Sequence, residues 1–236
     1  MIINTILDTD LYKFTTSYAY IKLFPSAIGT FSFRDRDETV YTKDFVLKLS
    51  EAIGDLKNVK LSERELEYMT NNCRFLPRVY WEWLSSFRFE PDKIKIHLDK
   101  GRHLNIEITD YLYKATLYEV PLLAIVSEIK NEILGNVADT SNIICKLLEK
   151  VMLSNQHQLP FSEFGTRRRF SYEVQDKVIA HLKRTSLNFT GTSNCHFAMK
   201  YDMKMMGTHP HEWFMFHGAQ FGYKHANYMA LENWVN

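Results

Sequence analysis

The sequence predicts an α/β protein, in which an α+β first part is followed by parallel strand–helix units. Three observations favour this fold class. Apolar and polar residues alternate over 94–98 and again over 104–108, and the short connection with a glycine at 101 is typical of a hairpin. Apolar residues at helical spacing lie on both sides of this hairpin. After the middle of the chain, short apolar segments, turns and amphipathic helices alternate, which indicates parallel units.

The first part opens with a predicted helix, for which Asp8, Thr9 or Asp10 supplies the N-cap. Its apolar face ends before Pro25, since proline does not continue a helix. Residues 30–34 alternate apolar and polar side chains, which predicts a strand with one face in water.

Further helices are predicted around the hairpin. Apolar spacing over 44–56 fits an amphipathic helix, and Ser62 and Glu65 have the capping-box spacing that opens another. The aromatic-rich stretch 81–89 fits either a helix or a loop. A longer helix is predicted within 117–133, with extended backbone at Val120 and Pro121, because a residue before proline avoids the helical region.

The second part is separated from the first by a predicted linker over 135–141. We therefore expect an N-terminal α+β domain over 1–135 and strand–helix units over 136–236. The elements expected in the second part are a helix over 142–153, a short segment at 159–161, a helix over 170–182, a strand end and turn over 189–194, a helix over 195–202 and a strand over 203–206.

Composition excludes several classes of protein. The chain has 236 residues with 29 Lys and Arg against 28 Asp and Glu, and a net charge of +1 argues against a general nucleic-acid or membrane-surface binder. The longest apolar run, 120–126, is too short to span a bilayer, and the N-terminus does not resemble a secretory signal. Three cysteines, Cys73, Cys145 and Cys195, form no CxxC pair, which favours a reduced, cytoplasmic setting.

Three polar turns follow the three expected parallel strands, so they should meet at the carboxyl edge of one sheet or barrel. The first carries the arginines 167–169, which suit phosphate or carboxylate. The second, 191–194, offers hydroxyl, amide and backbone N–H groups near a helix start. The third carries His211, a candidate nucleophile or base. Each turn alone also fits an ordinary solvent-exposed loop, and only their convergence favours an anion-binding site.

A metal site is the competing interpretation of the third turn. The candidate ligands are His209, His211, Glu212 and His217. No HExxH pattern is present and spacing identifies no dependable third ligand, so we expect no bound metal there. The sequence also contains no Walker-type loop, no GxGxxG and no GxSxG.

Five segments, in this order along the chain, resemble the nicotinate phosphoribosyltransferase family. They are Leu7-Asp8-Thr9-Asp10-Leu11-Tyr12-Lys13, Tyr118-Glu119-Val120-Pro121-Leu122-Leu123-Ala124, Glu163-Phe164-Gly165-Thr166-Arg167-Arg168-Arg169-Phe170-Ser171, Gly191-Thr192-Ser193-Asn194 and Gly207-Thr208-His209-Pro210-His211-Glu212-Trp213. The resemblance covers nearly the whole chain. Nicotinamide phosphoribosyltransferase is a near relative, but the Arg-rich and His-Glu-Trp segments resemble the nicotinate enzyme more closely.

The resemblance implies an activity and its substrates. The family joins nicotinate to 5-phosphoribosyl-1-diphosphate, giving nicotinate mononucleotide and diphosphate, and couples this step to ATP hydrolysis in NAD biosynthesis. His211 matches the histidine that the family phosphorylates, so its ring would accept the γ-phosphoryl group of ATP. The resemblance further implies Mg²⁺ with ATP and the sugar diphosphate, and a homodimer.

The same resemblance implies roles for six further residues. Tyr12 and Phe164 would cover the two faces of the pyridine ring, with Tyr12 in many homologues reaching in from a second subunit. Arg167 would meet anionic groups of the substrates, and Thr208 would lie close to nicotinate. Arg169 and Ser193 are expected on the same surface.

The resemblance also implies a fold, which is an N-terminal α+β domain followed by an irregular α/β barrel of the type II phosphoribosyltransferase kind. Family members continue beyond residue 236, so we expect only the first part of that barrel here, as a fragment or a natural short form. The alternative from another class is a non-catalytic remnant that binds ligand or only assembles.

Overall fold

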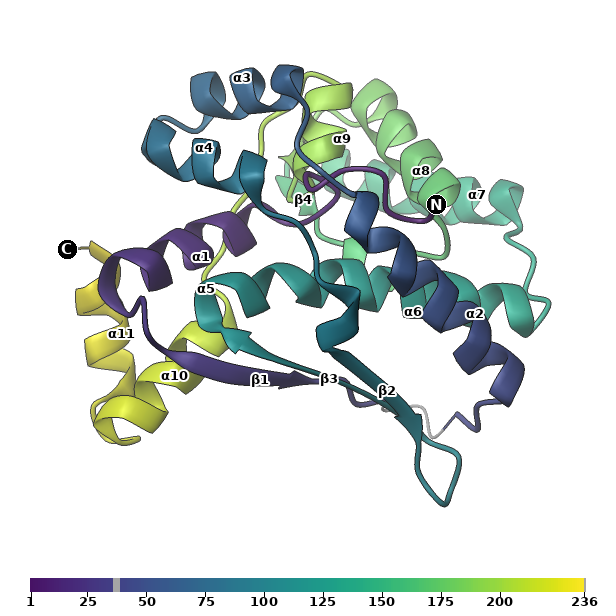
Figure 1. Cartoon of the computed structure of the whole chain (residues 1–236). Coiled ribbons are helices and arrows are strands. Elements are labelled where there is room, and N and C mark those ends of the chain that lie inside the picture. The colour runs from purple at the N-terminus through teal and green to yellow at the C-terminus, as the bar shows by residue number, and fades with distance from the viewer. Residues whose placement is uncertain (36–38, 236) are drawn as a thin grey trace.

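A computed structural model describes residues 1–35 and 39–235 (Figure 1). Asn236 lies outside the described residues. The chain forms two small sheets, each accompanied by helices, and the α/β fold class is that of the sequence prediction. Among the described residues, no helix is both long and apolar enough to cross a bilayer.

The first sheet has the order β1-β3-β2 and is antiparallel throughout. Its strands are β1 (Ile28–Ser32), β2 (Ile94–Leu98) and β3 (Leu104–Tyr111). The predicted hairpin is confirmed, because Ile96 pairs with Ile106 and Leu98 with Leu104. Alternate side chains of β3 are buried from residue 104 to residue 110, so one face of this sheet supplies the core.

Helices cover the buried face of the sheet and continue above it (Figure 1). They are α1 (Leu11–Leu23), α2 (Lys43–Gly54), α3 (Glu63–Asn72), α4 (Arg78–Ser86), α5 (Leu112–Ala115) and α6 (Glu119–Ile133), with 3-10 turns η1 (Asp55–Asn58), η2 (Pro91–Lys93) and η3 (Thr116–Tyr118). Asp10 is the N-cap of α1, as predicted, and Ser62 and Glu65 form the predicted capping box of α3. The aromatic-rich stretch is a helix as far as Ser86.

The prediction of extended backbone at Val120 and Pro121 is wrong, since both residues lie inside α6. Proline is harmful in a helix when it removes a hydrogen bond to the preceding turn. Here Pro121 is the third residue of α6, in the first turn, where N–H groups have no partner within the helix. The 3-10 turn η3 ends at Tyr118, next to Glu119, so the chain enters α6 without an extended segment.

The second sheet consists of the parallel strands β4 (Phe161–Glu163) and β5 (Phe189–Thr192). The strand expected over 203–206 contracts to a single parallel bridge between Thr192 and Met205. The helices of this part are α7 (Thr140–Gln156), α8 (Tyr172–Thr185), α9 (Cys195–Lys200), α10 (His211–Phe221) and α11 (Ala226–Val235), with a 3-10 turn η4 (Thr166–Arg168). The predicted parallel arrangement of three successive segments is therefore present, although the third is minimal.

Residues 7–11 connect the beginning of the chain to this second sheet. The Leu11 amide donates to the Ser193 carbonyl at 2.8 Å, and the Cys195 amide donates to the Thr9 carbonyl at 3.0 Å. The main core correspondingly contains Leu7, Leu11 and Cys195 together with side chains of the first sheet. The predicted boundary at residue 135 falls in the loop between α6 and α7, and a division into two domains stays a prediction.

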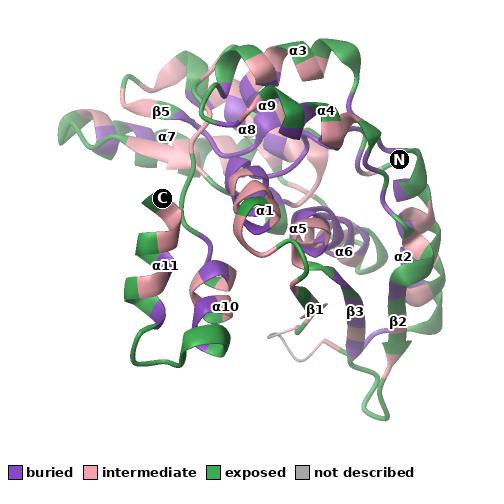
Figure 2. Cartoon of the chain, turned by 60° about the vertical axis from the view of Figure 1, so that its left-hand side comes forward, coloured by how far each residue is buried: buried purple, intermediate pink, exposed green. Residues whose placement is uncertain are grey.

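The last two helices form a second, smaller core with α1. Trp213 of α10 is fully buried, packs against Tyr20 and Phe24, and donates its indole N–H to the Ala230 carbonyl at 2.8 Å. In Figure 2, α10 and α11 lie side by side next to α1. This packing holds α10, whose first residue is His211, against α1.

Candidate functional site

The three predicted turns follow neighbouring parallel segments in the structure. Phe164 follows β4, Ser193 follows β5, and Thr208 and His211 follow the bridge at Met205. The carboxyl ends of parallel strands are where α/β proteins usually place their functional groups. The convergence on which the sequence prediction depends is therefore confirmed at the level of the backbone.

His211 is the first residue of α10 and is exposed to solvent. Pro210, the N-cap, has no side-chain hydrogen-bond acceptor, so the first N–H groups of α10 are not capped by a side chain. The positive end of a helix dipole and uncapped N–H groups favour a negatively charged ligand. Thr208 is also exposed, on the loop that leads into this turn. A phosphoryl group could therefore be attached to His211 without any rearrangement of the core.

The three consecutive arginines point in different directions. Arg167 is half-exposed and its Nη1 donates to Glu119 at 2.9 Å. Arg168 is exposed, whereas Arg169 is buried and donates to Asp8 at 2.8 Å and to Glu128 at 2.6 Å. Of the three, Arg167 and Arg168 remain accessible to a ligand, while the guanidinium of Arg169 joins segments of the protein itself.

A buried charge network lies beneath His211. The ammonium of Lys13 donates to Glu119 and, at 2.8 Å, to Glu212. Burial alone would lower the pKa of Lys13, but the two carboxylates raise it above its ordinary value, so this lysine is charged. Burial acts to raise the pKa of Glu119, yet Lys13 and Arg167 together hold it below the ordinary value. Burial raises the pKa of Glu212, which faces only one of these cations.

The two aromatic candidates differ in exposure. Tyr12 is 4% exposed within a single chain, and burial raises the pKa of its phenol above the ordinary value. Lys13 lies 5.3 Å from the centroid of the Tyr12 ring. Phe164 is 43% exposed on the loop after β4. The sandwich of a pyridine ring between Tyr12 and Phe164 stays a prediction.

The second turn uses its polar groups inside the protein. The Ser193 hydroxyl donates to Asp10 at 2.7 Å, and the Thr192 hydroxyl donates to Glu163 at 2.6 Å. Asn194 caps α9 and also donates to Asp8 at 2.8 Å. Burial raises the pKa of the Asp10 carboxyl to about 6, although the Ser193 hydroxyl favours the charged form. Ser193 is therefore a support for the first turn of α1, and its side chain is fully buried.

The residues weighed as metal ligands do not converge. Glu212 binds Lys13, while the His217 Nδ1 contacts the Trp213 carbonyl and its Nε2 contacts Asn233 at 3.0 Å. The ring of His209 packs against Trp234, with 4.5 Å between ring centroids. Over residues 1–35 and 39–235, no three His, Cys, Asp or Glu side chains are grouped so that they could hold a metal ion.

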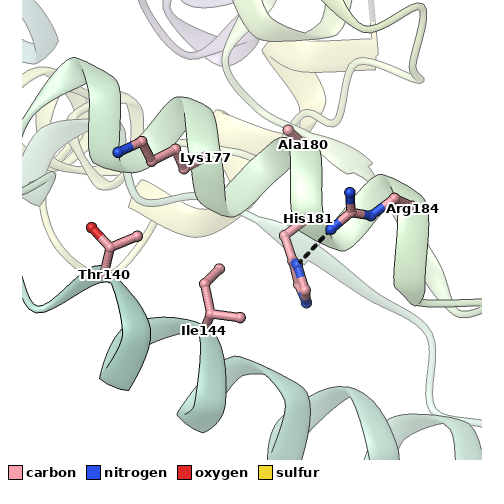
Figure 3. A pocket seen from close by; sticks show the side chains of 6 residues that line it. All are labelled: Thr140, Ile144, Lys177, Ala180, His181 and Arg184. Carbon is pink, nitrogen blue, oxygen red and sulfur yellow. Dashed lines mark hydrogen bonds between the residues drawn. The ribbon is translucent and has the colours of Figure 1, made fainter.

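A separate hollow of about 370 Å³ lies between α7 and α8 (Figure 3). It is lined by Thr140, Ile144, Lys177, Ala180, His181 and Arg184, none of which belongs to the predicted site. The His181 ring contacts the Arg184 guanidinium at 3.4 Å.

The sequence did not predict the roles of Lys13 and Thr116 in this network, nor the contacts that Glu119 makes to Lys13 and Arg167. Lys13 is fully buried, which is unusual for a lysine unless it is paired. The sequence carries no clear signal of this, because Lys13 lies beside the apolar face that Leu11, Phe14 and Tyr18 define, where a solvent-exposed lysine is ordinary. Its partners Glu119 and Glu212 are far away in the sequence.

Comparison with known proteins identifies the class to which this fold and site belong, the phosphoribosyltransferases. Residues 7–127 match the nicotinate phosphoribosyltransferase N-terminal domain, and residues 159–236 match the nicotinate phosphoribosyltransferase family. The chain belongs to the nicotinate phosphoribosyltransferase family. The resemblance seen in the five sequence segments is thereby confirmed.

Individual relatives agree with this membership. The nicotinate phosphoribosyltransferase of Chromohalobacter salexigens is 39% identical over 236 residues, which is 99% of this chain and 60% of the relative. That of Methanosarcina acetivorans is 38% identical over 249 residues, 99% of this chain and 61% of the relative. The crystal structure of nicotinate phosphoribosyltransferase from Porphyromonas gingivalis superposes with a TM-score of 0.97 at 43% identity, covering 100% of this chain and 61% of that one. The chain thus spans about three fifths of the length of these relatives.

Proposed function

We propose that this chain carries the nicotinate and ATP half-sites of a nicotinate phosphoribosyltransferase. The reaction transfers the phosphoribosyl group of 5-phosphoribosyl-1-diphosphate to nicotinate, giving nicotinate mononucleotide and diphosphate, for NAD biosynthesis by salvage. The observation that supports it most directly is the exposed His211 ring at the uncapped start of α10, in a chain of this family. Helix N-termini favour the phosphoryl group that the reaction would attach there.

The proposed role of His211 is nucleophilic. A ring nitrogen attacks the γ-phosphorus of ATP, the bond to the bridging oxygen breaks, and ADP leaves. The phosphohistidine is later hydrolysed, so the free energy of ATP is used to drive phosphoribosyl transfer. His211 meets the first requirement of a nucleophile, because it is reachable from solvent.

The nicotinate half-site is proposed to use Tyr12, Phe164, Arg167 and Thr208. Arg167 uses Nη1 for Glu119 and its side chain is 44% exposed, so other N–H donors can meet a carboxylate or phosphate. Phe164 offers an accessible ring face for a pyridine. Arg169 and Ser193 support this surface from below, through Asp8 and Asp10.

We further propose Mg²⁺ as the ion that accompanies ATP and the sugar diphosphate. Mg²⁺ commonly keeps several waters and binds through substrate phosphates with one or two carboxylates, so it does not require a dedicated protein cage. We also propose that the protein acts in the cytoplasm, where the free thiols of Cys73, Cys145 and Cys195 would remain reduced, and as a homodimer, as the family resemblance implies.

Intact-mass spectrometry after incubation with ATP and Mg²⁺ tests the proposal, with wild type and His211→Ala compared. We expect an added phosphate that is acid-labile and absent from the variant. A phosphate that persists in His211→Ala would reject this nucleophile. The absence of phosphate from the wild type would favour the non-catalytic alternative for this chain.

A further inference from the structure

Lys13 is a fully buried ammonium at the junction of three polar partners. Its Nζ contacts Glu119, Glu212 at 2.8 Å and Thr116 at 3.4 Å. A lysine ammonium has three N–H donors, so the number of partners matches the number of donors. These contacts connect α1 with α10 and with the continuous stretch formed by η3 and α6, which are three separate parts of the chain.

Glu212 is the second residue of α10 and follows His211 directly. One of its carboxylate oxygens accepts from Lys13 and the other accepts from the Thr116 hydroxyl. With both oxygens held, the carboxylate has one orientation relative to α1. The fixed side chain of Glu212 therefore also holds the backbone that joins Glu212 to His211.

Glu119 extends the same network toward the first turn. One of its oxygens accepts from Lys13 and the other accepts from Arg167 at 2.9 Å. A continuous series of hydrogen bonds thus runs from the half-exposed guanidinium of Arg167 to the residue beside His211. The two ends of this series, Arg167 and Glu212, are far apart in the sequence.

We propose that Lys13 is a positioning residue, which fixes the first turn of α10, and with it His211, relative to Arg167. This inference rests on the proposed function, because fixing His211 relative to Arg167 matters for the reaction only if His211 accepts a phosphoryl group and Arg167 binds a substrate anion. Lys13 itself does not touch a substrate. It acts through Glu212 on one side and through Glu119 on the other.

General stability does not explain this arrangement, because α10 is already attached to α1 by apolar contacts. Trp213, which is buried, and Phe216 pack on Tyr20 of α1. These contacts hold the body of the helix but begin only at the third residue of α10. The polar network acts on Glu212, the residue before Trp213, in the first turn of α10 that also carries His211.

The test uses the whole chain with Lys13→Met/Glu212→Gln, which removes one positive and one negative charge together. This double variant leaves no unpaired buried carboxylate at residue 212 and keeps the Glu119–Arg167 pair, so it is expected to fold even if Lys13→Met alone does not. The control is Lys48→Met, which removes an exposed lysine–glutamate pair between α2 and α6. Backbone hydrogen exchange and the initial rate of acid-labile phosphate incorporation from ATP are both measured.

We expect exchange at residues 213–217 of the double variant to be about tenfold faster than in the wild type, with α8 unchanged. The rate of phosphate incorporation at saturating ATP should fall about tenfold, while the ATP concentration for half-maximal rate stays the same. The control should match the wild type in both measurements.

Unchanged exchange at residues 213–217, or an equal loss of protection throughout the chain, would overturn the positioning role. A rise of about tenfold in the ATP concentration for half-maximal rate would instead indicate that Lys13 takes part in ATP binding, and would also overturn the positioning role. If the wild type incorporates no phosphate, the proposed function fails for this chain, and the exchange comparison still decides whether Lys13 fixes the start of α10.

Discussion

Arg169 contacts both carboxylate oxygens of Asp8 through one guanidinium nitrogen, at 2.8 and 2.9 Å, across 161 residues of sequence. The side chains of both residues are 1% exposed. The Nε of Arg169 donates to Glu128 at 2.6 Å, so this one guanidinium joins the first segment of the chain, α6 and the loop after β4. The last arginine of the triplet is thus a buried link beneath the arginines that remain accessible.

Arg169→Met should destabilise the protein by about 3–5 kcal/mol, because it leaves the carboxylates of Asp8 and Glu128 buried without their partner. Chemical denaturation measures the change. The adjacent and exposed Arg168 provides the control, and Arg168→Met should change the free energy of unfolding by less than about 0.5 kcal/mol. Equal effects of the two substitutions would contradict the role of the buried pair.

Asp10 should make stability depend on pH. Burial raises the pKa of its carboxyl from 3.8 to about 6, so the folded state holds this proton more tightly than the unfolded chain does. Ionisation of Asp10 therefore lowers the free energy of unfolding as the pH rises through this interval, by about 3 kcal/mol at 1.36 kcal/mol per pKa unit.

Asp10→Asn removes this ionisation. We expect the variant to equal the wild type at about pH 3, below the pKa of the unfolded carboxyl, and to be more stable by up to about 3 kcal/mol at about pH 7.5, as measured by urea denaturation at both values. A difference that is the same at the two pH values would show that Asp10 does not titrate in this way.

Gly191 should not tolerate a side chain. Its φ of +147° is rarely adopted by other residues, and a Cβ would lie 2.1 Å from the Lys204 carbonyl oxygen. Gly191→Ala should therefore cost about 2–4 kcal/mol and weaken the bridge between Thr192 and Met205. Gly54, at the end of α2, has no atom within 4 Å of such a Cβ. Thermal denaturation should show Gly54→Ala to be neutral or slightly stabilising.

Phe164 should contribute to ligand binding and little to stability, since it is 43% exposed. If it stacks on nicotinate as proposed, Phe164→Ala should raise the dissociation constant for nicotinate about tenfold, the equivalent of about 1.4 kcal/mol. Titration calorimetry measures this constant. Phe75→Ala, at a site 63% exposed, is the control and should leave it unchanged. Equal binding by both variants would remove Phe164 from the pyridine site.

Local features of the fold could be predicted from the sequence because their causes lie within a few residues. The capping box of Ser62 and Glu65 and the hairpin of β2 and β3 depend on neighbouring residues, and both are confirmed. The gathering of three turns followed from the geometry of parallel strands. Pro121 was misjudged because its effect depends on which turn of the helix it occupies, and the start of α6 was not visible in the pattern.

The buried charges beneath His211 could not be predicted, because each pair joins distant parts of the chain. Lys13 is 106 residues from Glu119 and 199 residues from Glu212. Nothing local to Lys13 indicates which acids it meets. Similarly, Ser193 fitted an exposed turn by composition, and only the position of Asp10 relative to β5 explains its burial.

The hydrogen bonds of residues 7–11 have a consequence for synthesis of the protein. Their partners Ser193, Cys195 and His196 are made more than 180 residues after them. The helix α1 therefore cannot reach its final position until residues 193–196 have been made. Contacts of such long sequence separation slow folding, so the nascent chain should stay exposed to chaperones until α9 has left the ribosome.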